Sequence, residues 1–394
     1  MLNFSFSTVL MALLTSSILI GLIAMVFHND NTLACAGYKL LGIFVGLTVI
    51  RLILPFEFPF TMSIPFSKTL SKIVAFFQKP QIEISHTTVS LWNLFELIWI
   101  IGIIYNIIRY MSQYRRAYNY ILKYGHDRTN VVKYKTILDT ICKQHSKKNH
   151  FRVMEMPSMN IPIIYGLKNP CIILPDNLSI SEEQLYYVLC HEAMHHFHHD
   201  FLIKCVIRFV AIVHWWNPAF TILYKQTNTL LEMHIDDIIT HKGADITDTY
   251  AECLLYMKEN SIKQSSQPMS DFLKKESCYL VQSQDKDFRR RLIILLQDFA
   301  MPKKVLISIL LMVLMVSVYL ASYFFIMEAD YSRPHFVEES LFVPDTDNTY
   351  FIQNDSLHYE LYINGIYLET VDSLEYYPKG IKIYNKKGEL IKEN

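Results

Sequence analysis

Two histidines with a glutamate between them are the first residues in this chain whose types and spacing suggest chemistry. The segment His191-Glu192-Ala193-Met194-His195 follows apolar residues with helical spacing. Four residues advance a helix by about one turn, so both imidazoles would project from one face and could hold one tetrahedral zinc ion. Glu192 lies beside them, where its carboxylate can take a proton from water and return it to a leaving amine. The pattern predicts zinc-dependent hydrolysis of a peptide bond.

A histidine-rich helix that merely faces water could show the same pattern. The chain contains 15 histidines, and His195 with His199 repeats the four-residue spacing. Only the pair His191 and His195 has glutamate in the second position. The alternative interpretation is a hydrated surface formed by His195, His196, His198 and His199.

A third metal ligand is needed, because a catalytic zinc site usually has three protein ligands and an open fourth position. The chain has no third histidine at the metzincin spacing, which directs the search to a carboxylate downstream. Glu232 and Asp236 are four residues apart among apolar neighbours, on one face of a predicted helix. We predict that Glu232 binds the metal and that Asp236 orients a ligating imidazole. The alternative is a solvated acidic face.

The elements that must position these residues can be read from turn and helix signals. Two short β-rich runs lie between Asn160 and Pro175, and Pro162 places the first of them at a sheet edge. Ser179 and Glu182 have the form of a capping box that would start the helix of His191. Residues 201–216 are apolar and helical in length, and Asn217-Pro218 predicts the start of the next helix.

Composition indicates that this block belongs to a membrane protein. Of the 394 residues, 51% are hydrophobic, which is high for a soluble chain of this size. Apolar windows long enough to cross the hydrocarbon core lie at about 4–27, 36–54, 89–108 and 305–326. A cleaved signal peptide is the competing interpretation of the first window, but its start has no basic residue.

Basic residues predict the orientation. Arg109, Arg115 and Arg116 follow the third window, and Lys303 and Lys304 precede the fourth, so both flanks should be cytosolic. The segment between the third and fourth windows would then be cytosolic, and the N-terminus and C-terminal segment would be extracellular. The loop 55–88 argues weakly against this orientation, since it contains Lys68, Lys72 and Lys79.

Two ionisable residues fall inside the windows. Arg51 and Glu96 would both lie toward the outer face, and a charge there is costly unless it is paired or reaches the headgroups. We therefore hypothesise a contact between Arg51 and Glu96. The alternative is that each side chain reaches the headgroups independently.

The C-terminal segment predicts a small β unit. Tyr359–Ile363 and Ile366–Glu369 flank Asn364-Gly365, a strong signal for a two-residue hairpin. Ile381–Tyr384 and Glu389–Ile391 flank a second turn at 385–388. The ligand of this unit cannot be read from the residues, and a peptide, another membrane protein or no partner are all open.

Charge and cysteine content exclude other classes. The 37 basic and 37 acidic residues balance, so no global field attracts nucleic acid. The seven cysteines form no CxxC pair, which predicts reduced, mostly buried thiols rather than a disulfide framework or a thiolate zinc site.

These features together resemble the membrane metallopeptidase family that includes the BlaR/MecR-type β-lactam sensor-transducers. The order of three spans, a protease domain and a fourth span agrees, from residue 1 to about 326. The matching residues are His191-Glu192-x-x-His195, Asp200, Trp216-Asn217-Pro218, Glu232-x-x-x-Asp236 and the strand pair Ile161–Pro175.

The resemblance implies a gluzincin-like site with one zinc ion per chain, bound by His191, His195 and Glu232, with Glu192 as the base. It further implies that the edge strand of Ile163, Ile164, Tyr165 and Gly166 binds the substrate backbone by strand addition. In the family, an outside signal activates the inner protease, which can cut itself and acts as an antirepressor by inactivating a transcriptional repressor. Ser261–Arg291 is a candidate self-cleavage region, with a plain cytosolic linker as the alternative.

The fold class expected from these observations is an α-helical membrane protein of four transmembrane helices with a cytosolic α+β gluzincin-like peptidase domain and a small extracellular β unit. A penicillin-binding sensor domain is not expected, since residues 327–394 contain no Ser-x-x-Lys tetrad. The expected domains are three spans within 1–110, the zinc peptidase at 111–302, the fourth span at 303–326 and the β unit at 327–394.

The leading functional hypothesis is a zinc endopeptidase that cuts cytosolic proteins in response to a signal. Its expected partners are a protein substrate such as a repressor, the lipid bilayer, an unknown extracellular ligand and a second copy of the chain in a homodimer. Two alternatives are a membrane quality-control zinc protease and a non-catalytic receptor with a structural zinc site. The intact Glu192 argues against the receptor, because a structural site needs ligands but no base.

Overall fold

The computed structural model divides the chain into two compact units, Met1–Ile64 with Ala75–Glu328, and Pro65–Val74 with Ala329–Asn394. The structure describes residues 6–56, 58–65, 68–78, 80–84, 87–157, 159, 161–166, 169–176, 178–241, 244–263, 285–296, 301–328, 349–353, 358–363, 365–371, 374, 377, 379–385 and 389–393. Most of the candidate self-cleavage region lies outside these residues.

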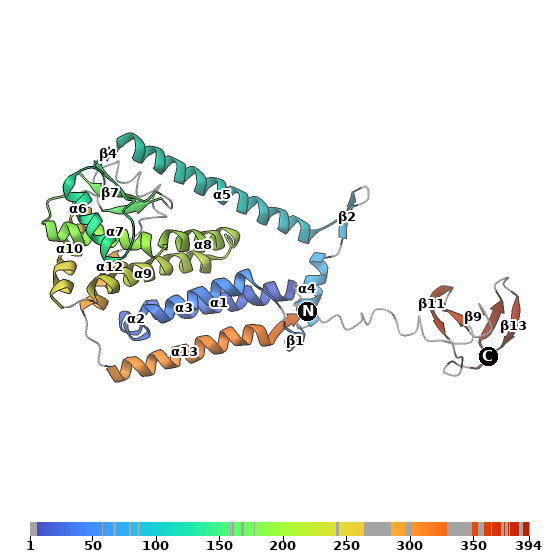
Figure 1. Ribbon diagram of the computed structural model, residues 1–394. Helices are drawn as coiled ribbons and strands as arrows, with labels where there is room; N and C mark the ends of the chain where they lie inside the picture. The colour runs from blue at the N-terminus through green and yellow to red at the C-terminus, as the bar shows by residue number, and fades with distance from the viewer. Residues whose placement is uncertain are drawn as a thin grey trace. The chain divides into compact units, whose positions relative to one another are not determined.

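Long apolar helices dominate the first unit (Figure 1). Within the described part of the chain, α1 (Phe6–His28), α5 (Leu91–Tyr124) and α13 (Met301–Phe324) are long and apolar enough to cross a membrane. The short α2 (Asp30–Ala36) and α3 (Tyr38–Ile53) meet at a bend of 81° and together form a fourth candidate span. Their positions agree with the four apolar windows, although the sequence did not predict that α5 continues to Tyr124.

The end of α13 differs from the prediction. The helix stops at Phe324, and Phe325–Glu328 form strand β8, which pairs with β1 (Met62–Pro65). The loop predicted at 55–88 contains further elements, namely α4 (Lys68–Gln78) and the antiparallel pair β2 (Pro80–Ile84) and β3 (Thr87–Ser90).

The hypothesised contact between Arg51 and Glu96 is wrong. Arg51 is fully buried, and its Nε and one terminal nitrogen donate to the hydroxyl and the carbonyl of Ser322 at 3.0 and 2.8 Å. Its guanidinium also lies 4.2 Å from the centre of the Tyr323 ring. Glu96 is exposed on α5. The physical reason is that α3 packs against α13, whose carbonyl, hydroxyl and aromatic ring can all stabilise a buried cation.

A four-stranded sheet lies in the same unit, in the order β4-β5-β7-β6. The two predicted runs are strands β6 (Ile163–Tyr165) and β7 (Cys171–Pro175), which pair antiparallel. The prediction that the first run forms an edge strand is confirmed. The sequence did not predict β5 (Arg152–Met156), which pairs in parallel with β7, or the two-residue β4 (His126–Asp127).

Helix α7 (Glu182–Phe197) lies in the core beside this sheet. Its buried residues pack with α6 (Val132–Gln144) and α10 (Ala244–Lys263). The capping box lies two residues later than predicted, because the Ser181 hydroxyl accepts from the backbone of Gln184 and the Gln184 side chain accepts in return. The predicted cap at Ser179 is therefore wrong in position, although the helix is correct.

Two further helices form a hairpin that packs among the long helices. Helix α8 (Asp200–Val213) contacts α5, and α9 (Pro218–Thr240) contacts α1 and α3. The predicted helix start at Asn217-Pro218 is confirmed, because the Asn217 side chain accepts from the backbone of Ala219 and Pro218 is the first helical residue. Helix α12 (Asp285–Leu296) packs against α9 and α10.

The second unit contains a five-stranded sheet in the order β11-β10-β9-β12-β13. The predicted hairpin is confirmed as β10 (Tyr359–Ile363) and β11 (Ile366–Val371), with Gly365 at a φ of 79°. The second predicted pair corresponds to β12 (Lys382–Asn385) and β13 (Leu390–Glu393), while Asn364 and residues 386–388 lie outside the described residues. The central strand β9 (Thr349–Gln353) was not predicted.

The thiols agree only in part with the prediction of mostly buried cysteines, because Cys35, Cys171 and Cys205 are half-buried. The six cysteines in the described part of the chain form no disulfide, and Cys142, Cys190 and Cys253 are buried.

Candidate metal centre

His191 and His195 lie on one buried face of α7. The helix packs its apolar residues into the core, and both imidazoles approach α9 with their ring centres 4.7 Å apart. The two Nε2 atoms are 3.2 Å apart. Both side chains are almost completely buried, unlike His198 and His199, which are exposed at the end of the helix. The hydrated histidine surface is thus limited to the residues that follow His195.

Helix α9 brings Glu232 to these two nitrogens. Its Oε2 lies 3.3 Å from the Nε2 of His191, and its Oε1 lies 3.5 Å from the Nε2 of His195. A tetrahedral zinc ion with bonds of about 2.0 to 2.1 Å separates its ligand atoms by about 3.3 to 3.4 Å. The three groups therefore have both the donor types and the spacing that a zinc ion requires.

Asp200 fixes the ring of His195. Its carboxylate accepts from the Nδ1 of His195 at 2.6 Å. This contact depends on the turn after α7, where His199 takes a left-handed conformation with a φ of 59° and lets Asp200 begin α8. A proton held on Nδ1 leaves the lone pair of Nε2 for a metal.

The ring of His191 is fixed by Tyr250 rather than directly by Asp236. Its Nδ1 lies 2.8 Å from the Tyr250 hydroxyl, which donates to Asp236 at 2.7 Å, whereas Asp236 itself is 3.8 Å from Nδ1. Arg291 of α12 binds the same carboxylate through two nitrogens at 2.7 and 2.8 Å. No spacing rule could have linked Tyr250 and Arg291 to this site, because they lie 14 and 55 residues after Asp236.

Charge in the cluster favours a cation between the ligands. Burial opposes ionisation of Glu232, but the cationic His195 and Arg291 outweigh it and hold the pKa of Glu232 well below its ordinary value. Burial also opposes protonation of His195, but Glu232 and Asp200 raise the pKa of His195 to about 9. Arg291 and Lys204 lie 3.1 and 3.8 Å from the Glu232 carboxylate. A metal ion would therefore take the place of the proton on His195.

The predicted base, Glu192, is buried next to His191 on α7. Among the residues that the structure describes, no other side chain forms a hydrogen bond or an ion pair with its carboxylate, whereas the other buried acids near the cluster are paired. It differs in this respect from Asp200 and Asp236, which hold the two imidazoles.

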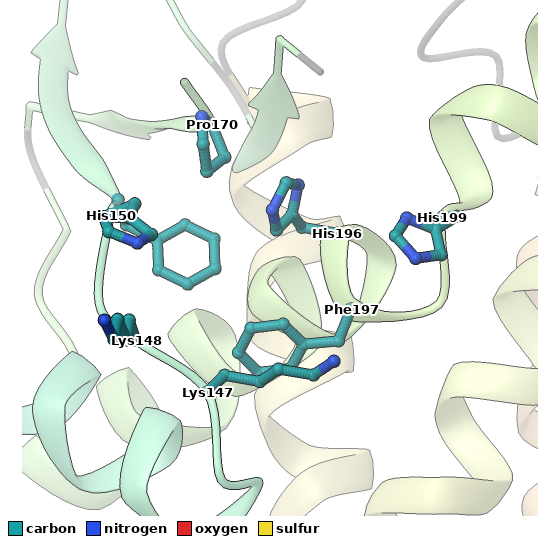
Figure 2. A pocket seen from close by; sticks show the side chains of 8 residues that line it. Lys147, Lys148, His150, Pro170, His196, Phe197 and His199 are labelled. Atoms are coloured by element: carbon teal, nitrogen blue, oxygen red, sulfur yellow. The ribbon is translucent and has the colours of Figure 1, made fainter. Parts of the chain in front are cut away.

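The remaining candidates lie near the cluster but outside it. Strand β6, which carries Ile163, Ile164 and Tyr165, lies beside α7, and Gly166 follows it at a φ of 98°. Figure 2 shows a separate surface hollow that contains none of the three candidate ligands. It is lined by Lys147, Lys148, His150, Phe151, Pro170, His196, Phe197 and His199.

The contact between Tyr250 and His191 can be tested through metal affinity. We expect Tyr250→Phe to weaken zinc binding about 10- to 100-fold, because His191 loses the hydrogen bond that orients its ring. Competition with a chelator measures this affinity. Tyr187→Phe is the matched control, since its ring packs against Tyr250 in the same core. Equal affinity of Tyr250→Phe and the unsubstituted protein would show that the hydroxyl does not support the site.

Known proteins are similar to this region of the chain. A family model described as BlaR1 peptidase M56 matches residues 41–295, which include all three candidate ligands and Glu192. The regulatory protein BlaR1 of Bacillus licheniformis is 28% identical over 177 residues, which make up 43% of this chain and 28% of that protein. The matched part therefore spans less than a third of that relative's length.

Proposed function

Because this chain belongs to the BlaR1 peptidase M56 family, we propose that it is a membrane-bound zinc endopeptidase that cuts protein substrates in regulatory signalling. The observation that supports this proposal most directly is the meeting of His191, His195 and Glu232 from two helices at the ligand spacing of zinc. The family and the long apolar helices support a membrane metallopeptidase.

Each residue would have a distinct part in hydrolysis. His191, His195 and Glu232 would hold the zinc ion, which when bound polarises the peptide carbonyl and lowers the pKa of water. Glu192 would accept a proton from the attacking water and deliver it to the amine nitrogen as the peptide bond breaks. Asp200 and Tyr250 would keep the two imidazoles in the orientation that their ligand role requires.

The substrate would bind along β6. This strand is at the edge of its sheet and lies beside α7, so an extended peptide could add to it as a further strand. The backbone of Ile163–Tyr165 would then set the register, and Gly166 would end the strand through its positive φ. This role for residues 163–166 is an expectation from the family resemblance.

We further propose that the metal centre faces the cytosol. Arg109, Arg115 and Arg116 lie on α5 toward the end that packs on the sheet, which agrees with the positive-inside rule. Cytosolic substrates would be the chain itself, near Ser261–Arg291, or a transcriptional repressor. The β unit of residues 349–393 would then be extracellular, where its ligand is unknown, and the functional form could be a homodimer.

Two other functions remain as alternatives to test. A quality-control zinc protease would use the same centre on misfolded membrane proteins. A non-catalytic receptor would keep a structural zinc ion, and the buried Glu192 beside the ligands argues against it.

Metal removal tests the proposal on the full chain. We expect a chelator to stop the appearance of substrate fragments in membranes that contain the protein, and added zinc to restore it, because hydrolysis needs the ion. Immunoblots of the chain and mass spectrometry of membrane and soluble proteins measure these fragments. Membranes that carry Glu192→Gln are the control for other metalloproteases. Fragments that persist without metal would contradict the proposed function.

A further inference from the structure

The hairpin of α8 and α9 turns an apolar face outward. Leu202, Ile203, Val206 and Phe209 recur at helical spacing on α8, and all four are exposed, Phe209 to 59%. Trp216, at the tip of the hairpin, is 53% exposed. A contiguous apolar face of this kind is costly in water and indicates a surface that another apolar phase covers.

The cations of α8 point away from this face. The Lys204 side chain is only 17% exposed, and its Nζ lies 3.8 Å from the Glu232 carboxylate. The Arg208 guanidinium lies 3.5 Å from the centre of the Tyr224 ring on α9. Because Lys204 and Arg208 contact α9, the outward face of α8 is apolar although the helix contains charged residues.

The tip of the hairpin contacts the middle of two apolar windows, 4–27 and 89–108. Asn217 donates to the hydroxyl of Ser17 at 3.0 Å, and Ser17 lies near the centre of the apolar stretch Ser7–His28. On the other side, the indole of Trp99 donates to the carbonyl of Val213 at 2.7 Å. Both contacts place the tip deep within the layer that the spans cross.

A close approach on α5 strengthens this placement. Trp215 packs so tightly against Gly102 that a Cβ atom there would lie 2.3 Å from the indole ring. Gly102 belongs to the apolar part of α5. No residue in the most apolar stretch of this helix is buried inside the structure. The outward face of the hairpin is therefore continuous with a surface that lipid would cover.

The base of the hairpin is level with the end of a span. Arg290 donates to the carbonyl of Phe27 at 2.6 Å and pairs with Asp30, where α1 ends. The next residue, Arg291, binds Asp236 and lies 3.1 Å from Glu232. The metal cluster thus lies beside the end of α1, while the tip lies beside its middle.

Lengths agree with this arrangement. The 14 residues of α8 extend about 21 Å at 1.5 Å per residue. Half of the hydrocarbon core measures about 15 Å. A helix that starts at the metal cluster and ends at the midplane would therefore begin just outside the hydrocarbon, among the headgroups.

We infer that the α8–α9 hairpin is a re-entrant element that inserts into one leaflet of the lipid bilayer, with the apolar face of α8 against acyl chains. Helices can enter hydrocarbon because their backbone groups are paired internally. Thr221 and Lys225 are the exposed polar residues on the first turns of α9, and the stem of Lys225 is long enough to carry its ammonium toward the headgroups. The inference goes beyond the proposed peptidase activity and does not depend on it.

One consequence concerns access to the metal centre. A centre at headgroup level meets peptide segments that lie along the membrane surface, or that emerge from a neighbouring span. Such segments would reach β6 without moving far from the membrane surface.

Photocrosslinking of the full chain in phosphatidylcholine and phosphatidylglycerol vesicles tests this insertion. The variants are Phe209→p-benzoylphenylalanine and, at the tip, Trp216→p-benzoylphenylalanine. The same residue at Ile101, which is exposed on α5, is the lipid-facing control, and at Val132, which is 78% exposed at the start of α6, it is the water-facing control. Mass spectrometry of the labelled peptides identifies phospholipid adducts, and size-exclusion chromatography shows that each variant is folded.

We expect phospholipid adducts at Phe209 and Trp216 in yields close to that at Ile101 and at least about tenfold above that at Val132. Yields at the level of Val132 would place the face in water and overturn the inference. Crosslinks to a second copy or to another protein would overturn it as well, because protein would then cover the face. The readout involves no metal or catalysis, so it is independent of the outcome for peptidase activity.

Discussion

Glu192→Gln should remove peptidase activity while the metal stays bound. The amide keeps the shape of the side chain but cannot accept a proton, so the attacking water is no longer activated. General base catalysis contributes about 10²- to 10⁴-fold to a rate, and we expect a loss in this range. The rate at which fragments appear, in membranes with equal amounts of each protein, measures it.

The zinc content of the purified variant distinguishes a missing base from a disrupted site. Glu192 is not among the three groups that meet at the ligand spacing, so the metal content should not change. Glu183→Gln, an exposed change in the first turn of the same helix, is the matched control and should retain activity. If Glu192→Gln cut substrates at the normal rate, the hydrolytic role of this centre would have to be abandoned.

Glu232→Ala should remove the metal itself. Loss of an outer hydrogen bond to a ligand typically weakens metal binding about 10- to 100-fold, and loss of a ligand should exceed this. We expect the metal content of purified protein to fall from one zinc ion per chain to near zero. Elemental analysis after dialysis against a weak chelator measures the content.

The variant also removes the Glu232 carboxylate that pairs with Arg291 and Lys204. Asp237→Ala is therefore the control, because it lies on the same helix but contacts Tyr38 and Lys39 of α3 instead of the metal cluster. It should keep its zinc even if it lowers the thermal stability. Unchanged zinc in Glu232→Ala would show that another group is the third ligand.

The parts of the fold that the sequence predicted are those with strong local signals. The apolar windows, the Asn217-Pro218 helix start and the hairpin around Gly365 each depend on a few neighbouring residues. Strand β5 was missed because Arg152–Met156 is short and residues on both of its faces are buried. Apolar and polar residues therefore do not alternate along it. Strand β9 is similar, since its pairing with β12 and β10 depends on chain segments that are distant in sequence.

In the candidate site, helical spacing could predict the three ligands but not the residues that hydrogen-bond to them and orient them. His191 and His195 were found because their four-residue spacing places them on one helix face in a recognisable motif. Glu232 was found because it lies four residues before Asp236 on a predicted helix. Tyr250 and Arg291 come from helices α10 and α12, and only the packing of those helices on α9 brings them to Asp236. The sequence predicted α8 as an apolar helix, but it could not show which neighbours cover the apolar face.

The contact of Arg51 with Ser322 restricts how movement could pass along the helices. Pulling the guanidinium away from Ser322 would leave a bare cation inside the helix bundle, at a cost of about 2.5 to 3.5 kcal/mol or more. The two helices that share this contact should therefore tilt or rotate together as one lever and not slide past each other. The opposite end of α3 holds Asp237 through the Tyr38 hydroxyl at 2.5 Å, one residue from the carboxylate that supports His191. A push on this lever from either end would reach the helix that carries Glu232.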